Sequence, residues 1–256
     1  MARRGGAWHA DAVEHADVWD EETARAYDAD LGNMGSAEVV SATVDLLVSL
    51  AAGGSALELA IGTGRVAVPL ADRGVPVSGI ELSEPMLAQL RTKADASRIR
   101  VVVGDMAHVR VPGDFSLVYL VFNTISNLLE QSEQVACFRN AAAHLRPGGR
   151  FVVELWVPDL RRLPPDRDAT IFEVEEGRIG LDTYDVVAQH VVSHHFRFDA
   201  GTGAQLFRSR HRYVWPAELD LMGELAGFEL EHRWADWSGA PFTAEAGSHV
   251  SVYRLL

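Results

Sequence analysis

The sequence predicts an α/β fold in which a sheet of parallel strands carries helices and a second, antiparallel sheet is inserted late in the chain. Between residues 53 and 160, short apolar runs alternate with helical patterns, as expected for repeated βαβ units. The first run, residues 57–59, enters a turn with Gly62 and Gly64 at a strand-to-helix junction. Beyond Pro158 the alternation stops, and segments of period two follow with no helix between them.

The composition fits one domain. With 256 residues and 48% hydrophobic content the chain can bury a full core, and no second domain is required. We expect a single domain with four parts: an N-terminal helical cap (1–52), a cofactor-binding core (53–160), inserted antiparallel strands (161–215) and a C-terminal completion of the core (216–256).

The charge and the cysteine content of the chain limit the kinds of molecule and metal that we expect it to bind. The 36 acidic and 23 basic residues give a net charge of -13, which repels nucleic acid and anionic membranes and favours a small, neutral or cationic partner. The single cysteine, Cys137, excludes an internal disulfide and a thiolate metal cluster, so we expect no metal. No apolar window approaches the roughly 20 residues of a membrane span, and no export signal follows the basic start, so a cytoplasmic location is expected.

Two helical patterns precede the first strand, between Val18 and Leu50. Trp19 and Tyr27 are eight residues apart and therefore share one face of the first helix. Helices in this place can fold over the end of the first strand. The two aromatic residues are then either part of a lid or ordinary core residues.

The glycine turn predicts a ligand site. Glycines let a ligand approach the main chain, and the free N–H groups of the following helix attract negative charge. The segment 62–67 also fits the dinucleotide pattern G-x-G-x-x-G/A, so NAD and S-adenosylmethionine are both candidates. Glu58 would repel a pyrophosphate but attract the ammonium of an amino-acid ligand, which favours S-adenosylmethionine. A plain turn beside a half-exposed Glu58 is the alternative.

Acids also end the next two strands. Glu81 ends the strand at 75–81, 17 residues after Gly64, where a carboxylate can accept from both hydroxyls of a ribose. Ser83 then caps a helix. Asp105 follows the strand at 99–103 and can accept from the adenine amine, while Met106 packs on the ring.

The fourth strand, residues 115–122, is a continuous apolar run typical of the middle of a parallel sheet. It ends in the polar cluster 123–127, and Asn123 is a candidate for orienting cofactor or substrate, together with Tyr27. A helix at 132–145 and a fifth strand at 151–156 follow.

The inserted segment contains a clear hairpin, with strands at 190–198 and 206–215 around a glycine-containing turn. Alternation puts aromatic and polar residues on one face of the second strand: Phe207, Ser209, His211, Tyr213 and Trp215. We expect this face to form the acceptor pocket, with His194, Tyr213 and Trp215 as substrate contacts. His211 is the candidate base, although a sheet histidine is often structural, and His194 and His195 point to opposite faces.

The strand and helix pattern resumes with a helix at 217–226 and ends with strands at 228–234 and 250–255. The segments 57–65, 79–87, 104–106 and 145–151 together resemble class I S-adenosylmethionine-dependent methyltransferases of the small bacterial type that modifies metabolites. This resemblance implies a Rossmann-like seven-stranded sheet whose last strand is antiparallel, with helices on both faces.

The resemblance also implies that the glycine turn holds the methionine moiety, that Glu81 holds the ribose and that Asp105 and Met106 frame the adenine. Ala60 stands where the family often has glycine. The cofactor contacts it implies are Trp19, Tyr27, Glu58, Ala60, Gly62, Gly64, Arg65, Glu81, Leu82, Met86, Gly104, Asp105, Met106, Val121 and Asn123.

The expected activity is methyl transfer from S-adenosylmethionine to an O or N atom of a small molecule, with secondary metabolites and amino sugars as candidates. The expected catalytic residues are Tyr27, Asn123 and His211. The inserted strands look like those of amino-sugar and glycine-type N-methyltransferases, where they cover the substrate or join subunits, so a homodimer through this sheet is an option. A nicotinamide-dependent oxidoreductase and an inactive S-adenosylmethionine-binding scaffold are the alternatives.

Overall fold

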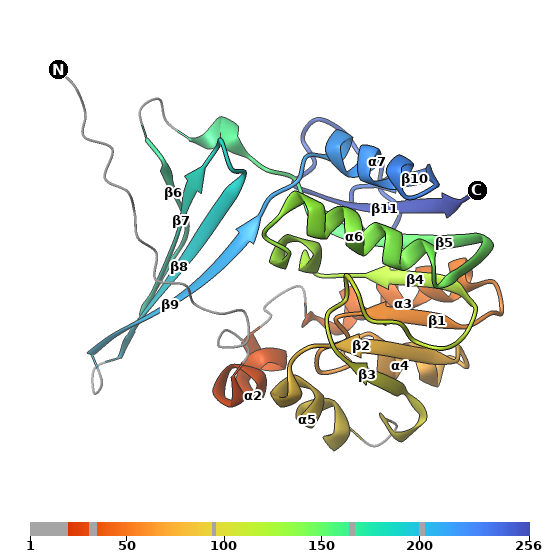
Figure 1. Ribbon diagram of the computed structural model, residues 1–256. Helices are drawn as coiled ribbons and strands as arrows, with labels where there is room; N and C mark the ends of the chain where they lie inside the picture. Colours follow the sequence, from red (N-terminus) through yellow and green to blue (C-terminus); the bar gives the residue numbers. More distant parts are fainter. Residues whose placement is uncertain (1–19, 31–34, 94–95, 164–166, 200–202) are drawn as a thin grey trace.

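The computed structural model describes residues 20–30, 35–93, 96–163, 167–199 and 203–256 (Figure 1). Its main sheet has seven strands, and all neighbours from β3 to β5 are parallel. The last strand of the chain, β11, runs antiparallel to both of its neighbours, as the resemblance implies. In sheet order the strands are β10 (Phe228–Trp234), β11 (Ser248–Leu255), β5 (Leu145–Trp156), β4 (Phe115–Leu120), β1 (Ala56–Leu59), β2 (Val77–Glu81) and β3 (Arg100–Val103).

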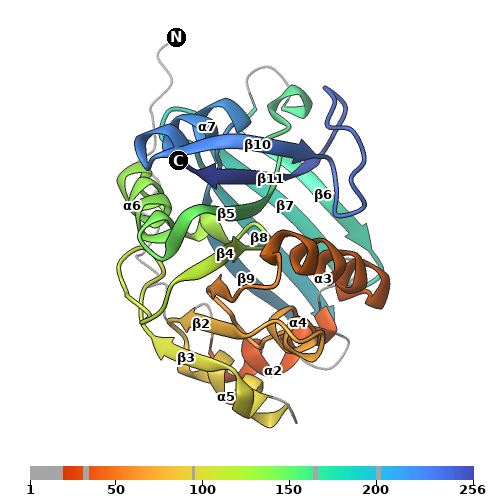
Figure 2. The same cartoon turned by 90° about the vertical axis from the view of Figure 1, so that its right-hand side faces the viewer.

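Helices cover both faces of this sheet (Figure 2). On one face lie α3 (Ala37–Ala51) and α4 (Ala67–Asp72), and on the other lie α6 (Gln131–Ala142) and α7 (Pro216–Leu225). The helix α5 (Glu84–Thr92) follows β2, and its predicted cap is confirmed because Ser83 Oγ accepts the Met86 N–H at 3.3 Å.

Two apolar cores result from the alternation of side chains along the strands. In β4 all six residues are buried; Val118 and Leu120 pack with α6 and α7, whereas Leu117 and Tyr119 pack with α3 and α4. Burial on both faces explains why the sequence of β4 is apolar apart from Ser116, whose hydroxyl donates to the Ala51 carbonyl at 2.8 Å. Cys137 is buried in the first of these cores.

The inserted segment forms a four-stranded antiparallel sheet that stands apart from the main sheet (Figure 1). Its strands are β6 (Ala169–Glu175), β7 (Arg178–Asp185), β8 (His190–Asp199) and β9 (Gly203–Arg212). The predicted hairpin is therefore confirmed, but β9 ends at Arg212, three residues earlier than expected. Because Pro216 is the first residue of α7, Trp215 becomes the N-cap of that helix and not part of a strand.

A buried ion pair fixes the point where the inserted sheet returns to the core. Arg212 is 5% exposed and its guanidinium donates to Gln134 Oε1 at 2.6 Å and to Glu218 Oε1 at 2.7 Å. Gln134 lies on α6 and Glu218 on α7, so one side chain ties β9 to two helices of the main domain.

The helix α2 (Glu21–Asp30) lies below the inserted sheet and packs against α5 (Figures 1 and 2). Trp19, which the sequence pairs with Tyr27, lies outside the described residues. Within the described parts of the chain, no helix is both long enough and apolar enough to cross a membrane.

Candidate active site

The glycine turn after β1 is built from left-handed backbone. Ala60, Gly62 and Gly64 have φ angles of 53°, 56° and 74°. At Gly64 a side chain would also meet Leu90 Cδ1 at 2.2 Å, so a larger residue would have to displace the Leu90 side chain as well as adopt left-handed backbone. Ala60 adopts a conformation that favours glycine, which is the residue that the resemblance leads us to expect at this position.

Glu58, the acid of β1, is buried beside Tyr119. The Tyr119 hydroxyl donates to Glu58 Oε2 at 2.9 Å, and the glutamate is 3% exposed. Burial raises the pKa of Glu58 to about 8. A cationic group placed next to this carboxyl would restore its negative charge.

Glu81, the acid that ends β2, is hydrogen-bonded to the glycine turn itself. Its Oε2 accepts the Gly62 N–H at 2.7 Å and its Oε1 accepts the Ser83 N–H at 2.8 Å. Burial raises the pKa of Glu81, and the backbone donors oppose this shift. Each carboxylate oxygen keeps a second lone pair, so Glu81 can still accept from a ligand.

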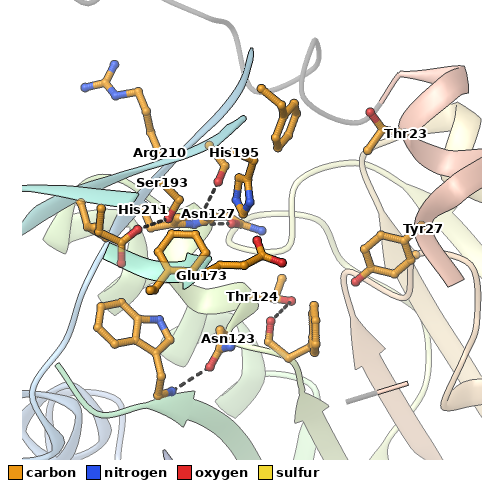
Figure 3. Close-up of a pocket in the computed structure, with 18 of the residues that line it drawn as sticks. Thr23, Tyr27, Asn123, Thr124, Asn127, Glu173, Ser193, His195, Arg210 and His211 are labelled. Carbon is orange, nitrogen blue, oxygen red and sulfur yellow. Dashed lines mark hydrogen bonds between the residues drawn. The ribbon is translucent and has the colours of Figure 1, made fainter. Parts of the chain in front are cut away.

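A cavity of about 1610 Å³ opens between the glycine turn, α2, the end of β4 and the inserted sheet. Figure 3 shows Thr23 and Tyr27 of α2 on one side and Glu173, Ser193, His195 and His211 of the inserted sheet on the other. The sequence-predicted residues that line it are Tyr27, Glu58, Ala60, Gly62, Arg65, Glu81, Met86, Val121, Asn123 and His211.

The residues expected to frame an adenine do not line this cavity. Gly104 lies beside β2, since its N–H donates to the Glu81 carbonyl at 2.8 Å. Asp105 Oδ1 accepts the Ala107 N–H at 2.7 Å, and Met106 is buried in the core that contains α6 and α7. Leu82 is 55% exposed. The end of β3 thus lies next to Glu81, at the same edge of the sheet, but outside the cavity lining.

The helix α2 is held on the glycine turn by a contact that the sequence does not suggest. Thr63 Oγ1 donates to Asp28 Oδ1 at 2.6 Å, and Lys93 Nζ pairs with Asp28 Oδ2 at 2.8 Å. We call Asp28, Thr63 and Lys93 the α2 latch. It places Tyr27 against the cavity, where the ring meets the edge of Phe122 at 6.3 Å and burial raises the tyrosine pKa to about 12.

The end of β4 carries two consecutive residues with left-handed backbone, Phe122 and Asn123, each with a φ of 59°. Non-glycine residues adopt this conformation at a cost and often do so at functional sites. Hydrogen bonds hold it: Phe122 N–H donates to Glu154 Oε2 at 2.7 Å, and Asn123 Oδ1 accepts the Trp156 N–H at 2.7 Å. Arg65 stacks over the Phe122 ring at 5.2 Å. Asn123 is therefore fixed at the cavity floor.

On the inserted sheet, the structure places His195 and not His194 on the cavity wall. His194 contacts Thr183 Oγ1 at 3.1 Å and Arg208, while the His195 ring lies between Phe172 and Phe207. Burial lowers the pKa of His195.

Tyr213 and Trp215 also lie outside the cavity wall. Tyr213 is 1% exposed and packs against Trp156 and Tyr184, and Trp215 caps α7. Both were expected as substrate contacts because the strand was predicted to run to residue 215, whereas the face alternation stops with β9 at Arg212.

The sequence analysis does not identify several polar residues of this wall, among them Asp182, Ser193 and Glu173, whereas Asn127 belongs to the polar cluster 123–127 that it places after the fourth strand. Asp182 accepts from Ser193 Oγ at 2.7 Å and from the Tyr184 hydroxyl at 3.2 Å, and burial raises its pKa. The alternation of β7 would place Asp182 and Tyr184 on one face, but only the pairing with β8 shows that this face meets the cavity.

Comparison with known proteins agrees with this architecture. Residues 56–149 match a family described as Methyltransferase domain. The solved structure of the CcbJ methyltransferase from Streptomyces caelestis is 38% identical, with a TM-score of 0.84, and the match covers 94% of this chain and 99% of that chain.

Two curated proteins are also similar. The cypemycin N-terminal methyltransferase from a Streptomyces species is 28% identical over 203 residues, which is 78% of this chain and 82% of that protein. The dTDP-3-amino-3,4,6-trideoxy-alpha-D-glucopyranose N,N-dimethyltransferase from Streptomyces venezuelae is 33% identical over 145 residues, 56% of this chain and 58% of that protein. The chain therefore belongs to the class I S-adenosylmethionine-dependent methyltransferases, related to those of bacterial natural products, and not to the nicotinamide-dependent oxidoreductases.

Proposed function

We propose that the chain transfers a methyl group from S-adenosylmethionine to an O or N atom of a small molecule held between the glycine turn and the inserted sheet. The main observation behind this proposal is a cavity of about 1610 Å³ that both elements border. Ligand pockets usually measure about 300–1,000 Å³. The space therefore suits two ligands that meet inside it.

We assign the cofactor side of the cavity to the residues of the glycine turn and the first two strands. Glu58 suits the ammonium of the methionyl end, because a cation would offset the burial that disfavours its charge. Gly62 lines the cavity and has no side chain to keep a ligand from its main chain, and Glu81 keeps lone pairs for two ribose hydroxyls. Gly104 and Asp105 follow β3 next to Glu81, where they could meet the adenine at the outer end of the cofactor.

When bound, the cofactor supplies a methyl group on a positively charged sulfur. The chain then mainly has to align the acceptor with that methyl group and to exclude water. Tyr27 covers the cavity from α2 and Asn123 holds its floor, and we assign both to orientation. The α2 latch couples this cover to the glycine turn.

The inserted sheet supplies the acceptor side. Its wall combines carboxylates, Glu173 and Asp182, with the aromatic rings of Phe172 and Phe207 around His195. Such a wall fits a polar acceptor that carries an amine. The relatives named above act on an amino sugar and on a peptide N-terminus, so an amino sugar or another amine-bearing secondary metabolite is the first candidate.

The cavity also supports the proposal that all four predicted parts work as one domain. It is lined by Tyr27 of the cap, Glu58 of the core, Asp182 of the inserted strands and Gly247 of the C-terminal part.

We also propose a homodimer through the inserted sheet, because the apolar side chains of Val174, Phe198 and Leu206 are exposed there. Light scattering of the wild type and of a Val174→Lys variant tests it, since a dimer through this face should dissociate in the variant.

Calorimetry and mass spectrometry test the function. We expect the chain to bind S-adenosylmethionine and S-adenosylhomocysteine, and then to add the mass of one or two methyl groups to an acceptor. The probes are dTDP-3-amino-3,6-dideoxy-glucose, its 3-hydroxy counterpart dTDP-6-deoxyglucose and a short peptide with a free N-terminus. Binding of the cofactor without any methyl gain would favour the inactive scaffold, and no binding heat would contradict the cofactor sites.

A further inference from the structure

Three polar side chains form a hydrogen-bonded line at the cavity wall. Ser209 and His211 lie two residues apart on β9 and so share its cavity face, and Asn127 ends the short helix η3 (Thr124–Asn127) that follows β4. His211 Nε2 lies 2.9 Å from Ser209 Oγ. His211 Nδ1 lies 3.1 Å from Asn127 Oδ1, and these two residues are labelled in Figure 3. All three residues line the cavity.

These contacts determine where the protons are. An amide oxygen can only accept, so the nitrogen beside Asn127, Nδ1, carries a hydrogen. In a neutral ring Nε2 is then an acceptor, and Ser209 must donate its hydroxyl proton to it. In a protonated ring Nε2–H donates to Ser209 Oγ instead. The same two contacts satisfy both charge states of His211, so uptake of a proton requires no rearrangement.

Ser209 is therefore prepared to receive a proton. Its one hydrogen points to His211, so the lone pairs of Oγ are the groups that it can offer to a ligand in the cavity. These lone pairs can accept a hydrogen bond from an N–H or O–H group. The ligand that fits here is therefore a methyl acceptor that carries such a group and can lose its proton.

We propose that Ser209, His211 and Asn127 form a proton relay that deprotonates the methyl acceptor, an inference that rests on the proposed function. The acceptor's N–H or O–H proton passes to Ser209 Oγ as the Ser209 proton passes to His211 Nε2. The acceptor atom bonds to the methyl carbon, whose bond to the cofactor's sulfur breaks with its electron pair left on sulfur. One positive charge disappears from the sulfur and one appears on His211, so charge is conserved. Asn127 is a positioning residue that holds Nδ1–H.

The neighbouring strands provide a matched comparison. Ser193 on β8 is directly opposite Ser209 and faces the same cavity, but it donates to the carboxylate of Asp182. Both serines are half-buried and line the same cavity, but the Ser193 hydroxyl is bonded to a carboxylate and the Ser209 hydroxyl to a histidine. The titratable groups on the cavity side of the packed strands include Glu173 of β6, Asp182 and Tyr184 of β7 and His195 of β8.

Two measurements on the chain without acceptor test the relay. Long-range ¹H–¹⁵N spectra report which imidazole nitrogen holds the proton, with His211 assigned through His211→Gln. We expect the Nδ1–H form in the wild type and a shift toward the Nε2–H form, which free histidine prefers, in Asn127→Leu. A wild-type ring in the Nε2–H form would overturn the relay.

The second measurement is labelling with a fluorophosphonate. The serine oxygen bonds to phosphorus, the phosphorus–fluorine bond breaks and fluoride leaves, while the serine proton passes to the base. Peptide mass analysis should find Ser209 labelled at least tenfold faster than Ser193. This rate should fall at least tenfold in His211→Gln and stay unchanged in Ser193→Ala.

Equal labelling of Ser209 and Ser193 would also overturn the relay. Neither measurement needs cofactor or acceptor, so failure of the proposed function is seen separately, as an absence of binding heat or of methyl gain. A chain that methylates the amino sugar but fails both measurements keeps its function and loses the relay.

Discussion

Gly62 and Glu81 are joined by a hydrogen bond of 2.7 Å from the glycine N–H to the carboxylate Oε2. This bond connects the turn after β1 to the end of β2. The two segments that the sequence assigns to different parts of one cofactor are thus a single hydrogen-bonded unit.

Replacing Glu81 should therefore affect both the cofactor and the turn. We expect Glu81→Ala to weaken S-adenosylhomocysteine binding by about 1–3 kcal/mol, the cost of losing a hydrogen bond to a charged group. The Gly62 and Ser83 N–H groups also lose their acceptor, so the melting temperature should fall. Calorimetry and thermal melts measure the two effects. Glu84→Ala is the control, because the pair of Glu84 with Arg91 is exposed. An unchanged dissociation constant in Glu81→Ala would exclude the contact between Glu81 and the ribose.

Glu58 should make stability depend on pH. Its folded-state pKa of about 8 lies above the ordinary 4.5, so the folded chain holds a proton that the unfolded chain releases. This contribution is fully present below pH 4.5 and is lost as the pH rises through 8. Urea unfolding of the wild type should give a free energy lower by roughly a few kcal/mol at pH 8 than at pH 5.

Glu58→Gln cannot titrate, so its stability should change less between the same two pH values. An equal loss in wild type and variant would show that Glu58 is not the group responsible. S-adenosylhomocysteine should also bind the variant more weakly, because the amide offers the ammonium no charge.

The α2 latch should control closure of the cavity and not global folding. Asp28→Ala removes the acceptor of both Thr63 and Lys93. We expect S-adenosylhomocysteine affinity to fall about fivefold, since a net hydrogen bond contributes roughly 1 kcal/mol. Hydrogen exchange should accelerate in residues 21–28 while the urea midpoint stays the same. Arg25→Ala breaks only the exposed pair with Glu21. This variant should keep both the S-adenosylhomocysteine affinity and the hydrogen-exchange rates of the wild type.

His211 should affect turnover and not cofactor binding. His211→Gln removes the base, and turnover of dTDP-3-amino-3,6-dideoxy-glucose should fall roughly 10²- to 10⁴-fold. The dissociation constant of S-adenosylhomocysteine should stay unchanged, because His211 lies on the inserted sheet and not at the glycine turn. His194→Gln is the control, since His194 is outside the cavity wall. Equal losses in the two variants would argue for a structural effect.

Arg212 should be important for stability. Arg212→Met leaves Glu218 without its buried partner, and removing one member of such a pair costs about 3–5 kcal/mol. Urea unfolding measures this loss. Arg254→Met breaks an exposed pair with Glu229 and should cost at most about 1 kcal/mol. Similar values for both variants would contradict a special role for the Arg212 pair.

The sequence by itself determines the main sheet and the glycine turn of this protein, because both depend on patterns among residues that are close together in the sequence. The run at residues 115–120 is apolar apart from Ser116 because both of its faces are buried, and this pattern is visible in the sequence alone. Gly62 and Gly64 mark left-handed backbone. Glu58 lies one residue before the end of β1 and Glu81 ends β2, and the parallel pairing of the two strands brings both acids to one edge. The inserted antiparallel sheet is likewise visible as a change of period.

Only the tertiary structure decides how the inserted sheet meets the core. Alternation separates His194 from His195, but the face that meets the cavity follows from the way Arg212 ties β9 to α6 and α7. Asn127 and His211 are 84 residues apart, and Asp28 and Thr63 are 35 apart. No local pattern relates such residues, since their contact arises from the packing of elements that are distant in the sequence.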